Sequence, residues 1–85
     1  MPYFNDEVLK EMINHAEASD DRYGNFASTH EALGVALEEW TELISAIQHN
    51  TIESIREEAI DLAAVLFRLA HQCRSNRDFI MRSQK

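Results

Sequence analysis

Apolar residues recur along this chain every three or four positions, the spacing that places side chains on one face of an α-helix. No run alternates between apolar and polar residues for long, so the pattern does not predict β-strands. The apolar residues form three stripes: Val8, Leu9, Met12, Ile13 and Ala16; Leu33, Ala36, Leu37, Trp40, Leu43, Ile44 and Ile47; and Ile52, Ile55, Ala59, Leu62, Ala63, Leu66, Leu69 and Ala70. The pattern predicts helices near 5–20, 29–49 and 51–73, and a short one near 76–82.

Start and stop signals agree with these boundaries. Ser28 with Glu31, and Asn50 with Glu53, have the spacing of a capping box, in which the first side chain accepts a hydrogen bond from the amide three positions later. Gly24 is placed to end the first helix, because glycine tolerates the left-handed backbone conformation that often follows a helix.

Two long helices joined by a short turn near residue 50 must run antiparallel. The predicted fold is therefore all-α: an antiparallel helical hairpin with a short helix on each flank, in one domain that spans residues 1–85. A chain of this length buries only about 60–65% of the surface that its unfolded form exposes, so its core is thin. One hairpin cannot cover its apolar stripes on all sides. We therefore expect a homodimer or homotetramer in which two hairpins complete a four-helix bundle.

The composition limits the compartment and the partners. Cys73 is the only cysteine, so no internal disulfide can form, which is typical of a reducing compartment. The first residues lack the features of a secretory signal, and no run approaches the roughly 18 apolar residues of a membrane span. We expect a cytoplasmic protein that does not enter a membrane. The 15 acidic residues outnumber the 8 basic ones, which argues against a nucleic-acid polymer as partner but not against one small phosphate compound held through a metal.

Two pairs of acidic residues stand at matching places on the long helices. Glu39 and Glu42 project from one face of the second predicted helix, and Glu58 and Asp61 from one face of the third, because residues three apart share a helix face. At about 100° per residue, each pair flanks the apolar stripe of its helix at the same offset. Glu42 and Glu58 are each eight residues from the turn at residue 50, so the four carboxylates are able to converge.

Four carboxylates that converge without a cation repel one another, raise one another's pKa values and destabilise the fold. A hard divalent cation that prefers oxygen ligands, Mg²⁺ or alternatively Mn²⁺, turns this repulsion into attraction. The pattern therefore predicts a magnesium site. The alternative from the residues alone is that these are ordinary solvated glutamates on the backs of the helices, and their spacing does not decide between the two.

In this helical context, the acidic pattern resembles the MazG-like, all-α nucleoside triphosphate pyrophosphohydrolase superfamily. That family carries Glu-x-x-Glu and, further along, Glu-x-x-Asp on two antiparallel helices. Here the motif is EWTE over residues 39–42 and EAID over residues 58–61, with fifteen residues between them. The segments RYG at 22–24 and HEALGV at 30–35 also resemble members of the family, so the resemblance covers roughly residues 22–70.

The resemblance implies magnesium-dependent attack of water on the α-phosphate of a nucleoside triphosphate, with release of pyrophosphate and a nucleoside monophosphate. It implies Glu39, Glu42, Glu58 and Asp61 as the metal ligands, and dimers or dimers of dimers. Glu38, directly before the first pair, is our candidate for orienting or deprotonating the attacking water. Two alternatives stay open: a phosphoribosyl-ATP pyrophosphohydrolase, which would share the motif, and a non-catalytic helical oligomeric interaction module.

Three further residues are candidates for binding the substrate. Arg68 lies on the acidic ridge of the third predicted helix, which makes it a candidate phosphate ligand. Tyr23 and His30 precede the hairpin, where aromatic and polar groups can contact a nucleobase. Trp40 lies at the centre of an apolar stripe, which favours packing in the core over stacking on a base. We expect His15, like the other histidines outside this loop, to be at the surface or half-buried rather than a ligand.

Overall fold

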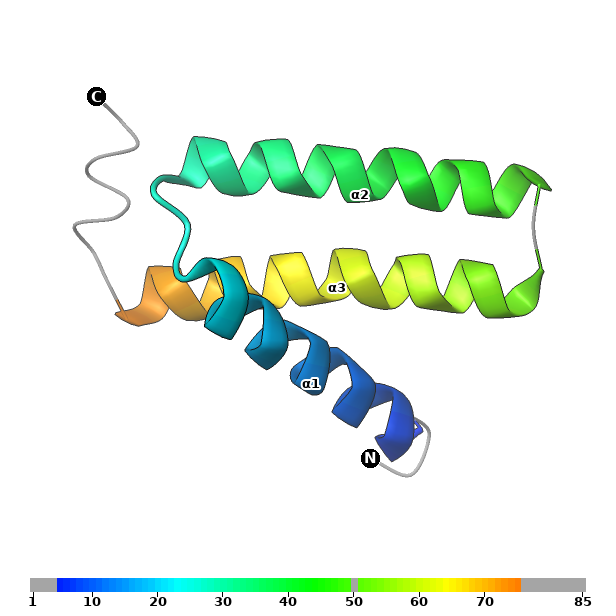
Figure 1. Cartoon of the computed structure of the whole chain (residues 1–85), viewed down its shortest axis with the longest axis horizontal. Helices are drawn as coiled ribbons and strands as arrows, with labels where there is room; N and C mark the ends of the chain where they lie inside the picture. The colour runs from blue at the N-terminus through cyan, green and yellow to red at the C-terminus, as the bar shows by residue number, and fades with distance from the viewer. Residues whose placement is uncertain (1–4, 50, 76–85) are drawn as a thin grey trace.

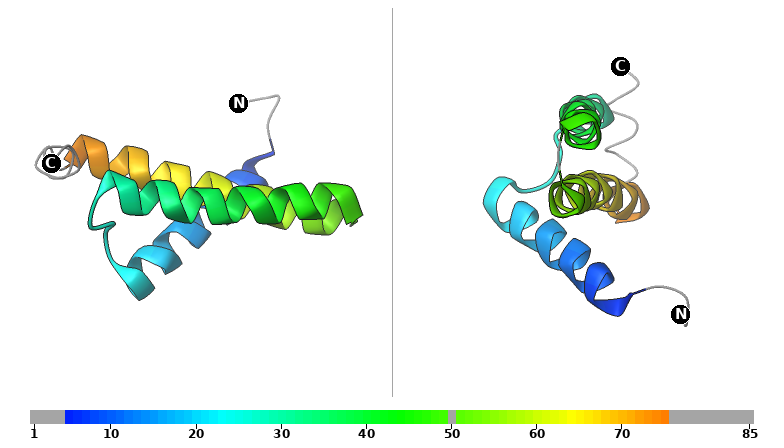
Figure 2. Two further views of the ribbon diagram at one scale, coloured as in Figure 1. Left: turned by 90° about the horizontal axis from the view of Figure 1, so that it is seen from above. Right: turned by 90° about the vertical axis from the view of Figure 1, so that its right-hand side faces the viewer.

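The computed structural model describes residues 5–49 and 51–75, and the predicted short helix near 76–82 lies outside them. The described chain forms three helices: α1 (Asp6–Tyr23), α2 (Thr29–His49) and α3 (Ile52–Ser75). α2 and α3 lie side by side and antiparallel, and α1 crosses α3 obliquely without packing on α2 (Figures 1 and 2). The all-α fold and its long hairpin are as predicted from the apolar spacing.

Local signals set both ends of α1. At its start, the side-chain oxygen of Asn5 accepts a hydrogen bond from the amide of Glu7 at 2.8 Å. At its end, Gly24 has a positive φ of 73°, and its amide donates to the carbonyl of Asp20 at 2.8 Å. Glycine is suited to this position because a side chain would be strained at such a φ angle.

Hydroxyl groups cap the other two helices. The hydroxyl of Ser28 accepts a hydrogen bond from the amide of Glu31 at 3.1 Å, as the capping-box spacing predicts. At α3, the hydroxyl of Thr51 accepts a hydrogen bond from the amide of Ser54 at 3.3 Å. The observed cap is therefore one residue later than the predicted one at Asn50, which lies outside the described residues.

The buried core is small and follows α3, where that helix meets the other two. Its apolar members among the described residues are Ala16, Phe26, Ala32, Ala46, Ile60, Ala64 and Val65. Most of these are alanines, which let helices approach closely but remove little apolar surface from water. The core is therefore thin, as expected from the chain length.

Most of the large apolar side chains of α2 point away from this core, whereas Val35 packs against it. Five of them are exposed: Leu33, Leu37, Trp40, Ile44 and Ile47. The face of α2 that packs on α3 instead carries the buried Ala32 and Ala46 and the half-buried Glu39. The prediction that Trp40 packs in the core is wrong for a single chain, because 51% of this residue is exposed. The helices meet through small side chains, and this close approach turns the stripe of large ones outward.

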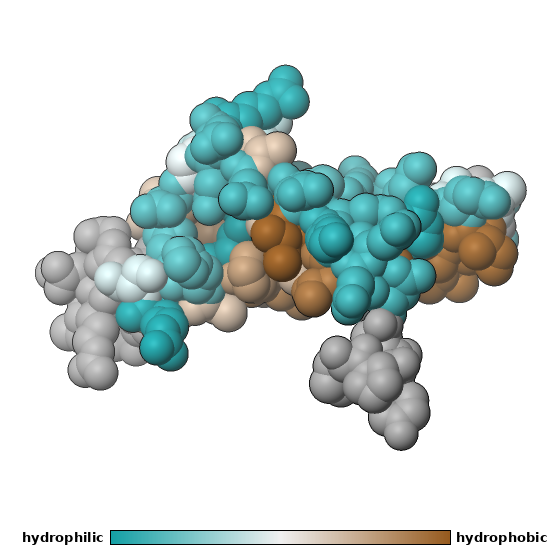
Figure 3. Space-filling view, turned by 90° about the horizontal axis from the view of Figure 1, so that it is seen from below, coloured by the Kyte–Doolittle hydropathy of each residue, from teal (hydrophilic) through white to brown (hydrophobic). Residues whose placement is uncertain are grey.

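The surface of the molecule is mostly hydrophilic in the view from below, with apolar side chains exposed in its middle and near the hairpin turn (Figure 3). Within residues 5–49 and 51–75, no helix combines the length and the apolar character that crossing a membrane requires.

Three polar pairs connect α1 to α3: Glu11 with Arg56, His15 with Asp61, and Asp20 with Arg68. These pairs fix the orientation of α1 on α3. They therefore also fix which side chains of α1 lie beside the hairpin.

Candidate metal centre and adjacent pocket

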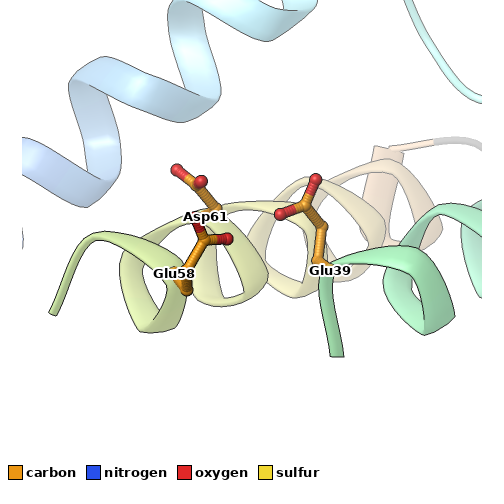
Figure 4. A group of neighbouring side chains, drawn as sticks. All are labelled: Glu39, Glu58 and Asp61. Carbon is orange, nitrogen blue, oxygen red and sulfur yellow. The ribbon is translucent and has the colours of Figure 1, made fainter. Parts of the chain in front are cut away.

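Three carboxylates meet between the two long helices. Glu39 from α2, and Glu58 and Asp61 from α3, each offer an oxygen atom, and these atoms lie within 4.8 Å of one another. The side chains are half-buried, and their carboxyl groups point toward a common space (Figure 4). The convergence expected from the matched spacing of the acidic pairs is thus observed for these three residues.

Glu42, the fourth predicted ligand, borders the cluster from an exposed position on α2. Its negative charge helps to raise the pKa of both Glu39 and Glu58. It is not one of the three residues whose oxygens meet within 4.8 Å. The structure therefore brings three of the four predicted ligands together and leaves the fourth at the edge.

Burial and mutual repulsion hold protons on this cluster. Burial is the main cause that raises the pKa of Glu39 to about 7, followed by the charges of Glu42, Asp61 and Glu58. Burial also raises the pKa of Glu58, with the charge of Asp61 as the second cause. A carboxylate in this setting is costly to ionise unless a positive charge balances it.

Two oxygen atoms of the cluster are buried and lack a hydrogen-bond partner: one of Glu39 and one of Glu58. A buried acceptor without a partner costs free energy, and the cost is larger for a charged group. A cation would satisfy both oxygens at once. Carboxylate oxygens are the ligands that Mg²⁺ and Mn²⁺ prefer, so the donor set fits a hard divalent cation.

His15 of α1 reaches this cluster, a contact that the sequence did not reveal. Its Nε2 atom lies 2.7 Å from Oδ1 of Asp61. The side chain is 41% exposed, so the expectation of a surface histidine is correct, but the expectation misses the contact. No local signal marks it, because it depends on how α1 packs across α3. Such a partner can fix the orientation of a carboxylate that binds a metal.

A pocket of about 580 Å³ opens beside the acidic residues. It is bounded by the second half of α1, the loop that follows, the first half of α2, and α3. Glu38 and Glu39 line it together with Tyr23 and Arg68, whereas His30 does not. The volume lies in the range of small-molecule binding sites, which is about 300–1,000 Å³. The structure thus gathers two of the three predicted substrate contacts around one pocket.

Arg68 anchors one wall of this pocket. Only 8% of the residue is exposed, and its guanidinium donates to the carboxylate of Asp20 at 2.7 Å and to the carbonyl of Gly24 at 3.0 Å. The guanidinium also lies 4.4 Å from the centre of the Phe26 ring. These contacts fix the end of α1 and the loop after it. A contact between Arg68 and a phosphate stays a prediction.

Gln72, one helical turn after Arg68, holds the same loop through its backbone. Its side-chain oxygen accepts from the amide of Phe26 at 2.9 Å, and its side-chain nitrogen donates to the carbonyl of Phe26 at 2.7 Å. Both residues are buried, so this pair of bonds satisfies two backbone groups that water does not reach. The loop that forms a wall of the pocket is therefore fixed in place by α3.

The fold and the site together define the class of protein, which is an all-α protein with a carboxylate-rich site beside a pocket. The family model of the MazG nucleotide pyrophosphohydrolase domain matches residues 27–83, which is more than half of the chain. The chain therefore belongs to this family, as its resemblance in sequence indicated. The match includes both acidic pairs, whereas α1 and its His15 lie before it. Searches of curated proteins and of solved structures returned no significant match.

Proposed function

We propose that this protein is a magnesium-dependent pyrophosphohydrolase that cleaves a ribo- or deoxyribonucleoside triphosphate to its monophosphate and pyrophosphate. The observation that carries the proposal is the meeting of Glu39, Glu58 and Asp61 within 4.8 Å. Membership of the MazG family supplies the class of reaction. The two buried carboxylate oxygens without partners supply the physical reason for a cation in this chain.

The acidic cluster binds the metal in this proposal. Glu39, Glu58 and Asp61 form the core of the site, and Glu42 completes it from the edge. His15 lies 2.7 Å from one oxygen of Asp61 and would fix the orientation of this carboxylate toward the metal. Mg²⁺, or Mn²⁺ in its place, supplies charge neutralisation at the phosphate oxygens and lowers the pKa of a water molecule.

The pocket beside the cluster takes the nucleoside part of the substrate. Its volume of about 580 Å³ and its position next to Glu38 and Glu39 support this assignment. Tyr23 offers an aromatic ring at the wall, with the guanidinium of Arg22 5.5 Å from the ring centre. Glu38 is exposed at the border between the pocket and the cluster, where a carboxylate can orient or deprotonate the attacking water. His30 does not line the pocket and has no role in this proposal.

We also propose a homodimer or homotetramer, because the apolar stripe of α2 is exposed and contact with a second copy of the chain would bury it. The substrate is a free nucleotide in the cytoplasm, and neither a nucleic-acid polymer nor a membrane takes part. The excess of acidic residues supports the first of these exclusions.

A turnover screen of the full chain tests the proposed function. The protein is incubated with millimolar Mg²⁺ or Mn²⁺ and with canonical triphosphates, modified triphosphates and phosphoribosyl-ATP, and both pyrophosphate and orthophosphate are measured. We expect pyrophosphate and a monophosphate from at least one nucleoside triphosphate, and in ¹⁸O-water the label in the monophosphate. Release of orthophosphate and a diphosphate would refute the site of cleavage. Turnover of phosphoribosyl-ATP alone would indicate a phosphoribosyl-ATP pyrophosphohydrolase instead. No turnover of any substrate would favour the non-catalytic interaction module.

A further inference from the structure

The part of the pocket that lies next to the acidic cluster has apolar walls on both long helices. Val35 stands one helical turn before Glu39 on α2, and Val65 stands one turn after Asp61 on α3. Both valines line the pocket, and Val35 packs against the buried group that contains Val65. One turn corresponds to about 6 Å along a helix at ~1.5 Å per residue. The pocket therefore changes from acidic to apolar within one turn of the cluster.

The wall that α1 contributes is also apolar at this level. His15 contacts Asp61, and five residues further along α1, Asp20 contacts Arg68. Ala18 lies between these two contacts on α1, as Val65 does on α3, and it lines the pocket as well. The apolar belt of the pocket therefore consists of Ala18, Val35 and Val65.

The polar side chains of the pocket lie at its two ends, on either side of the apolar belt. His15, Glu38 and Glu39 belong to the end at the acidic cluster. The opposite end is formed by the last turn of α1, the loop after it, the first turn of α2 and the buried arginine of α3. Its polar members are Ser19, Arg22, Tyr23, Asn25, Glu31 and Arg68.

A nucleotide bound as proposed above has its sugar at the apolar belt. Its α-phosphate lies at the acidic cluster, where the metal binds, and its base occupies the polar end of the pocket. Only the O5′ and C5′ atoms separate the α-phosphate from the sugar ring. The ring must therefore lie within the first turn beyond the cluster, where Val35 and Val65 form the wall.

We propose that the apolar belt selects 2′-deoxyribonucleoside triphosphates over ribonucleoside triphosphates, an inference that rests on the proposed function and narrows its substrate class. The C2′ carbon of a deoxyribose is apolar and packs against Val35 and Val65. A ribose instead places a 2′-hydroxyl there, which is both a donor and an acceptor and has no polar side chain of the belt as partner. Both sugars carry the 3′-hydroxyl, so its contribution cancels in the comparison.

Binding of nucleotides that cannot be cleaved tests this selection without relying on turnover. In α,β-imido triphosphates, an N–H group replaces the bridging oxygen whose bond to the α-phosphorus would break. Titration calorimetry of the full chain in millimolar Mg²⁺ compares the 2′-deoxy and ribo analogues of each of the four common bases. We expect the deoxy analogue to bind about 10–100-fold more tightly, which is the range in which an apolar pocket rejects an added hydroxyl.

A third sugar separates loss of hydration from simple crowding. The 2′-fluoro-2′-deoxy analogue fills part of the space of the hydroxyl but cannot donate a hydrogen bond, so it should bind nearly as tightly as the deoxy analogue. Equal or tighter binding of the ribo analogue, or no binding of either sugar, would overturn the proposal. Fluoro binding as weak as ribo binding would also overturn it, because the cause would then be size.

Threonine substitutions test whether the belt is the cause of the preference. Threonine has nearly the shape of valine but carries a hydroxyl in place of one methyl group, so Val35→Thr offers the 2′-hydroxyl a partner. We expect the ratio of ribo to deoxy dissociation constants to fall by about 3–10-fold, the range of one added hydrogen bond. Val8→Thr makes the same change at a residue that is 37% exposed and lies outside this pocket, and it should keep the parental ratio.

Val35→Ala provides a second variant if the threonine variant folds poorly by circular dichroism. It opens room for water beside the sugar, so it should also lower the ratio. A parental ratio in every folded variant at residue 35 would overturn the role of the belt.

Turnover distinguishes a failure of this inference from a failure of the proposed function. If the parent releases pyrophosphate from both sugars with the same kcat/KM, the hydrolysis is correct and the sugar selection is wrong. If nothing is cleaved while the imido analogues show the preference, the selection is correct and the hydrolysis is wrong.

Discussion

Acidification should stabilise the metal-free protein between about pH 8 and about pH 5.5, in contrast to the usual effect on an acidic protein. The pKa of Glu39 is about 7 in the folded chain, compared with an ordinary value of 4.5, and that of Glu58 is raised as well. The folded state therefore binds these protons more tightly than the unfolded state does. Stability from this source is fully present below the unfolded pKa and is lost as the pH rises through the folded pKa.

The size of the effect follows from the pKa of Glu39 and from its partial exposure. A pKa of about 7 against 4.5 corresponds to at most about 3.5 kcal/mol, at ~1.4 kcal/mol per pKa unit. Solvent screening of this half-buried group reduces the expected change in the free energy of unfolding to about 1–2 kcal/mol. For a domain of this size, the melting temperature should then be about 5–10 °C higher at the acidic end.

Thermal unfolding followed by circular dichroism in EDTA, at several pH values, measures this dependence. Glu39→Gln should show a flatter profile and should exceed the parent in stability near the alkaline end, because the amide cannot ionise. Glu17→Gln, on an exposed position of α1, is the matched control and should keep the parental profile. Saturating Mg²⁺ should remove most of the pH dependence. If the melting temperature of the parent in EDTA does not change with pH, or rises toward pH 8, these carboxylates do not repel one another in the folded chain.

Three further predictions concern the metal, its neighbour and the loop. Mg²⁺ at 100 times its dissociation constant should raise the free energy of unfolding by about 2.7 kcal/mol per site, which corresponds to on the order of 10 °C in melting temperature. Identical melting curves in EDTA and in magnesium would contradict a metal site. His15→Gln should weaken Mg²⁺ binding by about 10–100-fold in titration calorimetry, because Asp61 loses its orienting partner, whereas His49→Gln should not. Gln72→Leu should lower the free energy of unfolding by about 2–4 kcal/mol in urea, because both backbone groups of Phe26 lose their partners, and an equal loss in His71→Leu would contradict this explanation.

Local patterns were sufficient to predict the three described helices and the acidic pairs. Helix boundaries depend on apolar spacing and on caps such as Ser28 and Gly24, which are local in the sequence. The meeting of Glu39 with Glu58 and Asp61 required only the helix period and the position of one turn. The helix boundaries and the meeting of the carboxylates depend on features within one hairpin. They could therefore be predicted from the sequence before the packing of the helices was known.

Contacts that depend on packing were not predictable in this way. The rotation of α2, which buries alanines and exposes Trp40, depends on which side chains allow the closest approach to α3. The contact between His15 and Asp61 joins helices that are not neighbours in sequence, and it depends on the crossing of α1 over α3. In the sequence, Gln72 is one of several polar residues near the end of α3, and only the path of the loop shows that it binds Phe26.

The most direct test of the proposed metal-dependent hydrolysis is the rate of pyrophosphate release by matched variants on α2 and α3. Asp61→Asn and Glu42→Gln keep the shape of the side chain but remove a ligand charge, and Glu57→Gln makes the same change at an exposed position beside the cluster. We expect turnover to fall by about 100-fold or more in the first two, a loss of about 2.7 kcal/mol in transition-state stabilisation, and to stay within a few-fold of the parent in Glu57→Gln. Parental turnover in Asp61→Asn, or an equal loss in Glu57→Gln, would contradict the assignment of these carboxylates to the metal.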